Sequence, residues 1–114
     1  MKTVNIEFYK GTTEGYELLF YEDGLLVDIT GWKVYFTVKE KMNDSDANAK
    51  IAKTISSHED ALNGKTLIEL SKTDTNITKG NYYYSIDYKD DEDNEDVLIR
   101  GRLVVKESVL DSRS

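Results

Sequence analysis

The stretch VDITGWKVYFTVKE, residues 27–40, joins a tight polar turn to a regular strand pattern. Asp28 and Thr30 have side chains that accept hydrogen bonds from nearby backbone N–H groups, and Gly31 tolerates a positive φ. After this turn the apolar residues recur at every second position, which is the period of a strand with one buried face. We therefore expect a central strand that turns four side chains into the core: Trp32, Val34, Phe36 and Val38.

Shorter runs with strand character occupy much of the remaining chain, at residues 3–9, 16–21, 25–28, 50–55, 66–71, 81–88 and 97–106. Between them lie Gly, Asn, Asp, Ser and Thr, and there is no proline. Short strands with turn signals roughly every ten residues predict an all-β, immunoglobulin-like antiparallel β-sandwich of about seven to eight short strands. We expect one domain over residues 1–114, with its core at about 3–107, a loop at 41–49 and a frayed tail at 108–114.

The composition argues against several classes of partner and site. The formal net charge is −7, so nucleic acid and anionic membranes should be repelled at long range. The chain has no cysteine, which excludes disulfides and thiolate metal sites. Its first residues lack the apolar run of a secretory signal, and no stretch is long enough to span a bilayer. We expect a soluble protein.

Two polar groups could suggest chemistry, and neither has the required spacing. The acidic run at residues 89–96 lacks the sixth-place glycine and the terminal glutamate of a calcium loop. His58 is the single histidine, and its acidic and hydroxyl neighbours share its own loop, whereas triad members come from separate elements. We treat it as a surface residue. The expected protein therefore has no catalytic residues, no metal and no cofactor.

The last two strands can be aligned around the acidic run so that every pair falls on a consistent face. The expected pairs are Tyr88–Val97, Ile86–Ile99, Tyr84–Gly101 and Tyr82–Leu103 on the apolar face, and Ser85–Arg100 and Tyr83–Arg102 on the other. In this register the outer side carries a basic and aromatic stripe on an acidic protein. Arginine and tyrosine are enriched at protein interfaces, so we expect this stripe to be the contact surface: Tyr83, Arg100, Arg102 and Lys106. The alternative is that these residues form a cation–π pair on an ordinary sheet surface that binds no partner.

Over residues 16–107 the chain resembles the N-terminal β-sandwich domain of upper baseplate proteins of phages of Gram-positive bacteria, and related small tail or fibre modules. The resemblance rests on a glycine and Asp-x-Thr-Gly turn before an alternating strand, a Leu and Asp-Thr segment before a Gly-x-Tyr-x-Tyr-x-Ile strand, and a closing Gly-x-Leu-x-Val strand. The matching residues are Gly24, Val27, Asp28, Thr30, Gly31, Val34, Phe36, Val38, Leu70, Asp74, Thr75, Gly80, Tyr82, Tyr84, Ile86, Gly101, Leu103 and Val105.

This resemblance implies a non-catalytic structural or docking module of a phage or prophage particle, in a baseplate, tail or fibre attachment. Its partners would be other virion or tail proteins, or further copies of the chain. It would be found in the virion, or in the host cytoplasm during assembly. A carbohydrate-binding β-sandwich module is the alternative, since exposed tyrosines suit sugar rings.

Overall fold

The computed structural model describes residues 2–41, 43, 45 and 48–107. The expected tail at 108–114 lies outside the described residues, and so does part of the expected loop at 41–49. The described chain forms ten strands and one 3-10 turn. They are β1 (Lys2–Thr3), β2 (Ile6–Tyr9), β3 (Glu14–Leu19), β4 (Tyr21–Glu22), β5 (Leu25–Leu26), β6 (Lys33–Lys39), β7 (Ile51–Ile55), η2 (Ala61–Asn63), β8 (Lys65–Leu70), β9 (Gly80–Lys89) and β10 (Glu95–Lys106).

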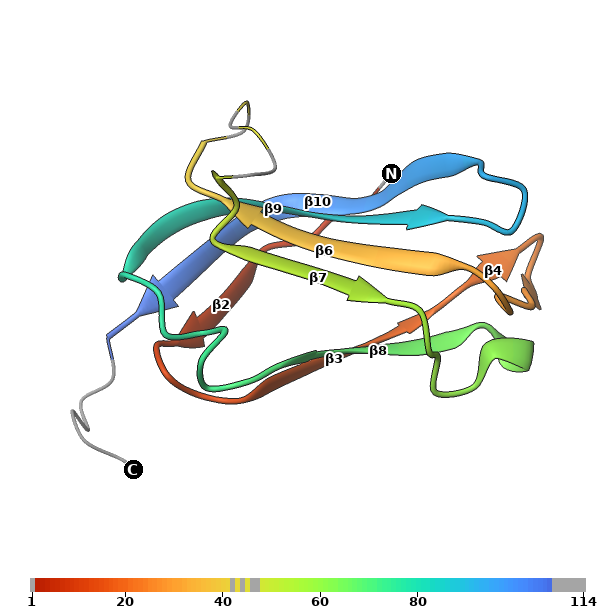
Figure 1. Ribbon diagram of the computed structural model, residues 1–114, viewed down its shortest axis with the longest axis horizontal. Coiled ribbons are helices and arrows are strands. Elements are labelled where there is room, and N and C mark those ends of the chain that lie inside the picture. The colour runs from red at the N-terminus through yellow and green to blue at the C-terminus, as the bar shows by residue number, and fades with distance from the viewer. Residues whose placement is uncertain (1, 42, 44, 46–47, 108–114) are drawn as a thin grey trace.

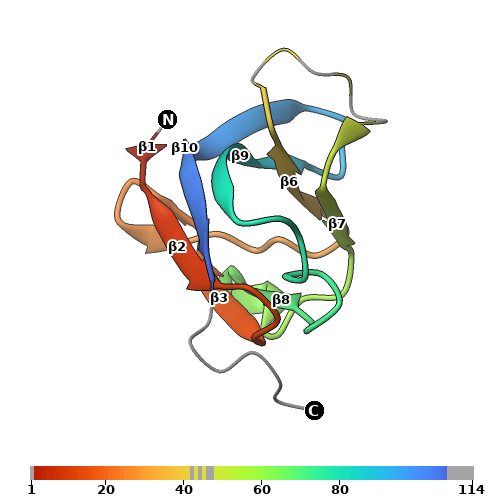
Figure 2. The same ribbon diagram turned by 90° about the vertical axis from the view of Figure 1, so that its left-hand side faces the viewer.

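The strands form two layers, as Figure 1 shows. The larger sheet has the order β1-β10-β9-β6-β7, with β2 also pairing with β10. The smaller layer is the pair β3-β8, and β4 and β5 form a short separate ribbon at one end. The end-on view in Figure 2 shows β2 descending from the large sheet toward β3, which closes one side of the sandwich. The protein is thus the expected all-β, immunoglobulin-like sandwich, with the β6, β9 and β10 sheet extended by β7.

One part of the fold prediction is wrong, because the sheet is not purely antiparallel. Both β1 and β2 run parallel to β10, with Thr3 opposite Arg100 and Ile6 opposite Leu103. The expected strand over residues 3–9 is interrupted between these two segments, and Val4 is 37% exposed there. Parallel pairing needs a long crossover, which here is nearly the whole chain, so no local pattern signals it.

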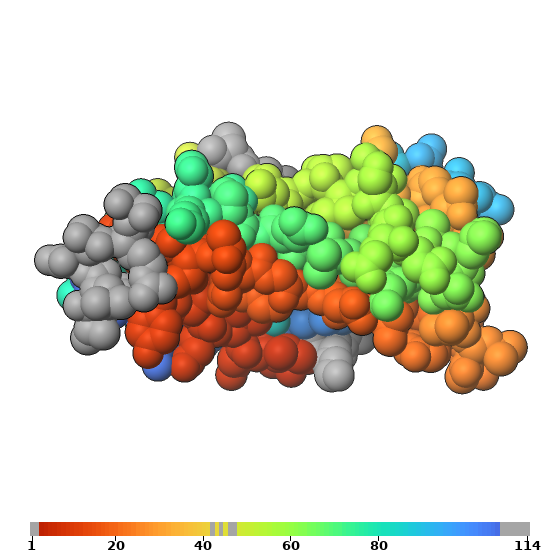
Figure 3. Space-filling view, turned by 90° about the horizontal axis from the view of Figure 1, so that it is seen from below, coloured from red at the N-terminus to blue at the C-terminus, as the bar shows by residue number. Residues whose placement is uncertain are grey.

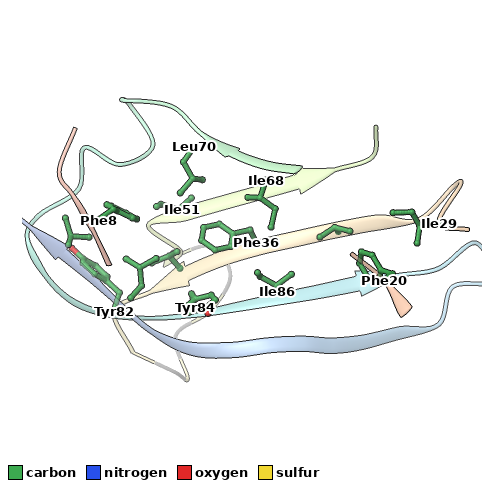
Figure 4. Packing of buried hydrophobic residues seen from close by; sticks show 14 residues of the cluster. Phe8, Phe20, Ile29, Phe36, Ile51, Ile68, Leu70, Tyr82, Tyr84 and Ile86 are labelled. Atoms are coloured by element: carbon green, nitrogen blue, oxygen red, sulfur yellow. The ribbon is translucent and has the colours of Figure 1, made fainter. Parts of the chain in front are cut away.

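The core fills the space between the two layers. Its members are Phe8, Phe20, Ile29, Val34, Phe36, Val38, Ile51, Ile68, Leu70, Tyr82, Tyr84, Ile86, Leu103 and Val105. Figure 4 shows Phe36 near the middle of this cluster, with Ile68 and Leu70 from the smaller layer on one side and Tyr84 and Ile86 on the other. The alternation predicted for β6 is confirmed, since Val34, Phe36 and Val38 are fully buried.

Trp32 stands at the edge of this core and is only half-buried. It stacks on Tyr88 with ring centroids 4.9 Å apart, and it meets Phe20 edge-on at 5.6 Å. These three rings close one end of the sandwich. Pairs in such offset or edge-on arrangements contribute about 0.5–1.5 kcal/mol each beyond their burial.

The polar turn before β6 forms as its residues predict. The Thr30 backbone N–H and hydroxyl both donate to Asp28 Oδ1, at 2.9 and 2.6 Å. These bonds hold the pKa of the Asp28 carboxyl below its usual value. Gly31 adopts φ +83°, the conformation that glycine permits. The turn therefore directs the chain into β6.

A second local feature marks the entry to β9. The Tyr82 hydroxyl donates to the carbonyl of Thr78, four residues upstream. A tyrosine near the start of the equivalent strand makes this backward bond in immunoglobulin-like domains, where it is called the tyrosine corner. It ties the start of β9 to the connection that follows β8.

Candidate functional site

The solvent side of the larger sheet gathers the candidate residues, and we call it the outer sheet face. It consists of Tyr35, Thr37 and Lys39 from β6, Tyr83, Ser85 and Asp87 from β9, and Arg100 and Arg102 from β10. The strand registers align these residues in rows. One row runs Lys39–Tyr83–Arg102, and the next runs Thr37–Ser85–Arg100.

The expected register of the last two strands is confirmed from Ile86 and Ile99 onward, including Tyr84 opposite Gly101 and Tyr83 opposite Arg102. It is wrong at the other end, where Tyr88 lies opposite Asp96 and not Val97. A bulge between Val97 and Ile99 inserts one extra residue on β10 and causes this shift. The bulge restores the alternation that places Arg100 and Arg102 outward.

The two arginines are the most accessible charges of the outer sheet face. Both are exposed, and within the described part of the chain neither guanidinium forms an ion pair. Tyr83 lies half-buried beside them. The Arg102 backbone N–H donates to Asn5 Oδ1 at 3.2 Å, which ties the β10 backbone to the N-terminal segment. The arginines therefore project from a fixed backbone with their donors open to a partner.

The outer sheet face is hollowed on both sides of Tyr83 and Arg100. One shallow depression of about 290 Å³ is lined by Thr37, Lys39, Tyr83, Tyr84, Ser85 and Arg100. A second, of about 400 Å³, is lined by Thr3, Asn5, Tyr83, Arg100, Gly101 and Arg102. Both are broad and open. Shallow, open depressions of this kind suit the side chains of a protein partner better than a small enclosed substrate.

Lys106 is the fourth residue of the expected stripe, and it lies apart from the other three. It shares the outward side of β10, four residues beyond Arg102, or about 13 Å along a strand. Its ammonium already pairs with Glu7 at 2.9 Å, and this carboxylate raises the pKa of Lys106. The structure thus groups Tyr83, Arg100 and Arg102, while Lys106 is already paired with Glu7 of the neighbouring strand β2.

Two further charged residues of the outer sheet face lie outside the expected stripe. Lys39 lies directly opposite Tyr83, and Asp87 lies opposite Tyr35. The alternation of β6 places Lys39 outward, but the β6–β9 register that brings it beside Tyr83 is a tertiary pairing. Asp87 Oδ1 is shielded from solvent and accepts no hydrogen bond from any other described residue.

His58 is not the surface residue that its sequence context suggested. Its Nε2 lies 2.8 Å from the carbonyl oxygen of Trp32, and its Nδ1 lies 2.8 Å from the Thr66 hydroxyl. A carbonyl oxygen only accepts, so Nε2 carries the proton, and in the neutral ring Nδ1 accepts from Thr66. Thr66 is fully buried. His58 therefore joins the loop after β7 to β8 and to the start of β6, which is a structural role.

The acidic loop between β9 and β10 is organised by its own first residue. Asp90 Oδ1 accepts the backbone N–H groups of Glu92 and Asn94, both at 2.9 Å, and Oδ2 accepts the Asn94 side-chain amide at 3.2 Å. The backbone bond from Asn94 leads the causes that hold the pKa of Asp90 below its usual value. Lys89 pairs with Asp93 at 3.4 Å.

Over the described residues, no group of three or more His, Cys, Asp or Glu side chains is arranged to hold a metal ion. No helix in that part of the chain is long and apolar enough to cross a membrane. Comparison of the sequence with protein-family models gave no match, and a search of curated proteins likewise found no relative.

Proposed function

We propose that the chain is a non-catalytic docking module of a phage or prophage particle, and that its outer sheet face contacts an acidic surface of another virion protein. The observation that carries this proposal is the pair of open guanidiniums, Arg100 and Arg102, on the rigid sheet of a protein with net charge −7. The phage assignment is supported by the sequence resemblance, whose turn residues Asp28, Thr30 and Gly31 make the bonds and the positive φ described above.

The physical case for docking rests on geometry and charge. The strands β1, β10, β9, β6 and β7 average about seven residues in length. At about 4.8 Å between strands and 3.3 Å per residue, they give a projected area of roughly 500 Å². Allowing for side-chain relief, that approaches the ~800 Å² that one partner contributes to a standard interface. Arginine binds carboxylates through two parallel hydrogen bonds, and its planar group also packs on aromatic rings such as Tyr83. An acidic partner would therefore find both charge and packing complementarity here.

The test compares two double variants in the intact particle. Arg100→Ala/Arg102→Ala removes the open cations, and Lys72→Ala/Lys79→Ala removes the same charge from the exposed loop before β9. Lys79 pairs with Glu107 at 3.4 Å, and both side chains are exposed, so the control should change stability little. We expect both variants to fold and only the arginine variant to lose incorporation into the particle. Equal incorporation of both, or cross-links that map to the smaller layer, would refute the choice of surface.

A carbohydrate-binding module is the second candidate, because Tyr35 and Tyr83 both lie on the outer sheet face. The two tyrosines are separated by four residues along the strands, or about 13 Å, so one sugar ring could not stack on both of them. Calorimetric titration with cell-wall and surface oligosaccharides would show binding that Tyr83→Ala removes if this reading is correct. Absence of binding would leave the docking function.

A further inference from the structure

An exposed apolar cluster lies at the end of the sandwich where the β4–β5 ribbon meets η2, and we call it the apolar end. It consists of Tyr21, Leu25, Leu26 and Leu62, which are 59%, 73%, 46% and 71% exposed. Figure 3 shows residues 20–27, in orange, beside the light-green segment around η2 at this end of the molecule. Leu25 lies opposite Glu22 and Leu26 lies opposite Tyr21, so the ribbon carries exposed apolar side chains on both of its faces. Scattered exposed leucines are ordinary, but large apolar residues on both faces of one ribbon and on the adjoining η2 segment are typical of an interaction site.

The apolar end has a fixed backbone. Phe20 N–H donates to the carbonyl of Gly64 at 2.9 Å, and Ile29 N–H donates to the carbonyl of Ala61 at 2.9 Å. A Cβ at Gly64 would lie 2.6 Å from the Val27 carbonyl oxygen, so the two segments touch at this glycine. Gly64 also has φ +70°. These contacts hold η2 against the residues that flank the ribbon, and Leu62 on η2 remains 71% exposed.

The rim of the apolar end is acidic. Glu22 ends β4, Asp23 lies in the turn that follows, and Glu59 and Asp60 precede η2. Lys65 adjoins this rim, but it already pairs with Glu59 at 3.4 Å and with Glu17 at 3.7 Å. Two apolar ends facing each other would bring these carboxylates together, which disfavours symmetric pairing through this surface. The complementary partner must combine an apolar or aromatic surface with open cations.

The outer sheet face has that chemistry. From these observations we infer that the apolar end of one copy docks on the outer sheet face of a second copy, with Arg100 and Arg102 meeting the acidic rim and Tyr83 packing on the leucines. This inference rests on the proposed function, since it names a partner for the same face. The two surfaces differ, so the contact is heterologous and would continue into a ring or an open fibre. The net charge of −7 on each copy opposes association, so the contact should be weak.

The test uses the full chain and two variants that each remove one surface. Leu25→Ser/Leu62→Ser removes the apolar end and keeps the sheet face, and Arg100→Glu/Arg102→Glu does the reverse. All four residues are exposed, so both variants should keep the melting temperature of the parent. Sedimentation equilibrium from about 10 µM to 1 mM should show the parent rising above its 13.0 kDa mass, with each variant alone remaining monomeric.

Mixing the two variants is the decisive measurement. The leucine variant retains an intact outer sheet face, and the arginine variant retains an intact apolar end. The mixture should therefore form a 1:1 complex of twice the monomer mass and nothing larger. A parent that stays monomeric at 1 mM, a mixture that fails to associate, or a dimer that survives both double variants would overturn the inference. A parent that stays monomeric would leave the docking proposal standing if the Arg100→Ala/Arg102→Ala variant still failed to enter the particle. Normal incorporation of that variant would refute the docking proposal separately.

Discussion

Replacing Gly101 with alanine should destabilise the fold, because the N-terminal segment passes directly over this residue. A Cβ built there would lie 1.9 Å from the carbonyl oxygen of Val4 and 3.2 Å from Cε1 of Tyr84. The oxygen belongs to the backbone, so it can withdraw only if the whole segment between β1 and β2 moves. The expected pairing of Tyr84 with Gly101 is present, but the crossing of Val4 is the stronger constraint.

The size of the effect follows from the bonds that this movement would break. Val4 N–H donates to the carbonyl of Arg100 at 3.2 Å, the Tyr84 hydroxyl donates to the carbonyl of Val4, and Asn5 accepts from Arg102 N–H at 3.2 Å. Each such bond contributes about 0.5–1.5 kcal/mol net, so losing all three costs about 1.5–4.5 kcal/mol. Alanine in a strand recovers about 0.5–1 kcal/mol relative to glycine. The net loss is about 0.5–4 kcal/mol, or a fall in Tm of about 2–16 °C.

Gly15 provides the matched control for this substitution. It also lies within a strand, and a Cβ there would meet only Leu67 Cδ1 at 3.8 Å, an ordinary contact. Gly15→Ala should therefore leave Tm unchanged or raise it, in thermal unfolding followed by circular dichroism. Tyr84→Phe should cost less in the Gly101→Ala background than in the parent, because its bond to Val4 is already broken. If Gly101→Ala melts within 1 °C of the parent, or if both alanine variants fall equally, the crossing does not constrain this position.

Three further results are expected. His58→Ala should lower the free energy of unfolding by about 1–3 kcal/mol in urea, because the buried Thr66 hydroxyl loses its partner; a smaller loss in a Thr66→Val background would confirm that path. Burial tends to raise the pKa of Asp74, but the bonds from Lys53 and Ser71 outweigh it and leave the pKa below its usual 3.8. The ionised Asp74 carboxylate therefore contributes its full stabilisation well above pH 4, and this contribution is lost as pH falls through the folded pKa. The difference in unfolding free energy between the parent and Asp74→Asn should accordingly become smaller in acid. A difference that stays constant from pH 7 to pH 3 would contradict this. Because the loop backbone already uses the Asp90 carboxylate, calorimetry should show no micromolar binding of Ca²⁺, and a micromolar dissociation constant would overturn that view.

The sequence by itself determined the strands and their faces, since these depend on nearest neighbours along the chain. Alternation identified the buried side of β6 at Val34, Phe36 and Val38, and the short acidic connection between β9 and β10 fixed most of the register that turns Arg100 and Arg102 outward. A hairpin has a small loop-closure cost and a local pattern of side chains, so its register can be worked out from residues close together in sequence.

Only the tertiary structure decided the contacts between distant segments. The parallel pairing of β1 and β2 with β10, and the crossing of Val4 over Gly101, join residues almost a full chain length apart. His58 resembles an ordinary loop residue until Thr66 and the Trp32 carbonyl close around it. The leucines of β5 and η2 carry the same apolar signal as core residues, yet they remain exposed. The hydrophobicity of a side chain determines how much free energy its burial would release. Whether it is buried depends on which other segment packs against it, and that is determined by the fold of the whole chain.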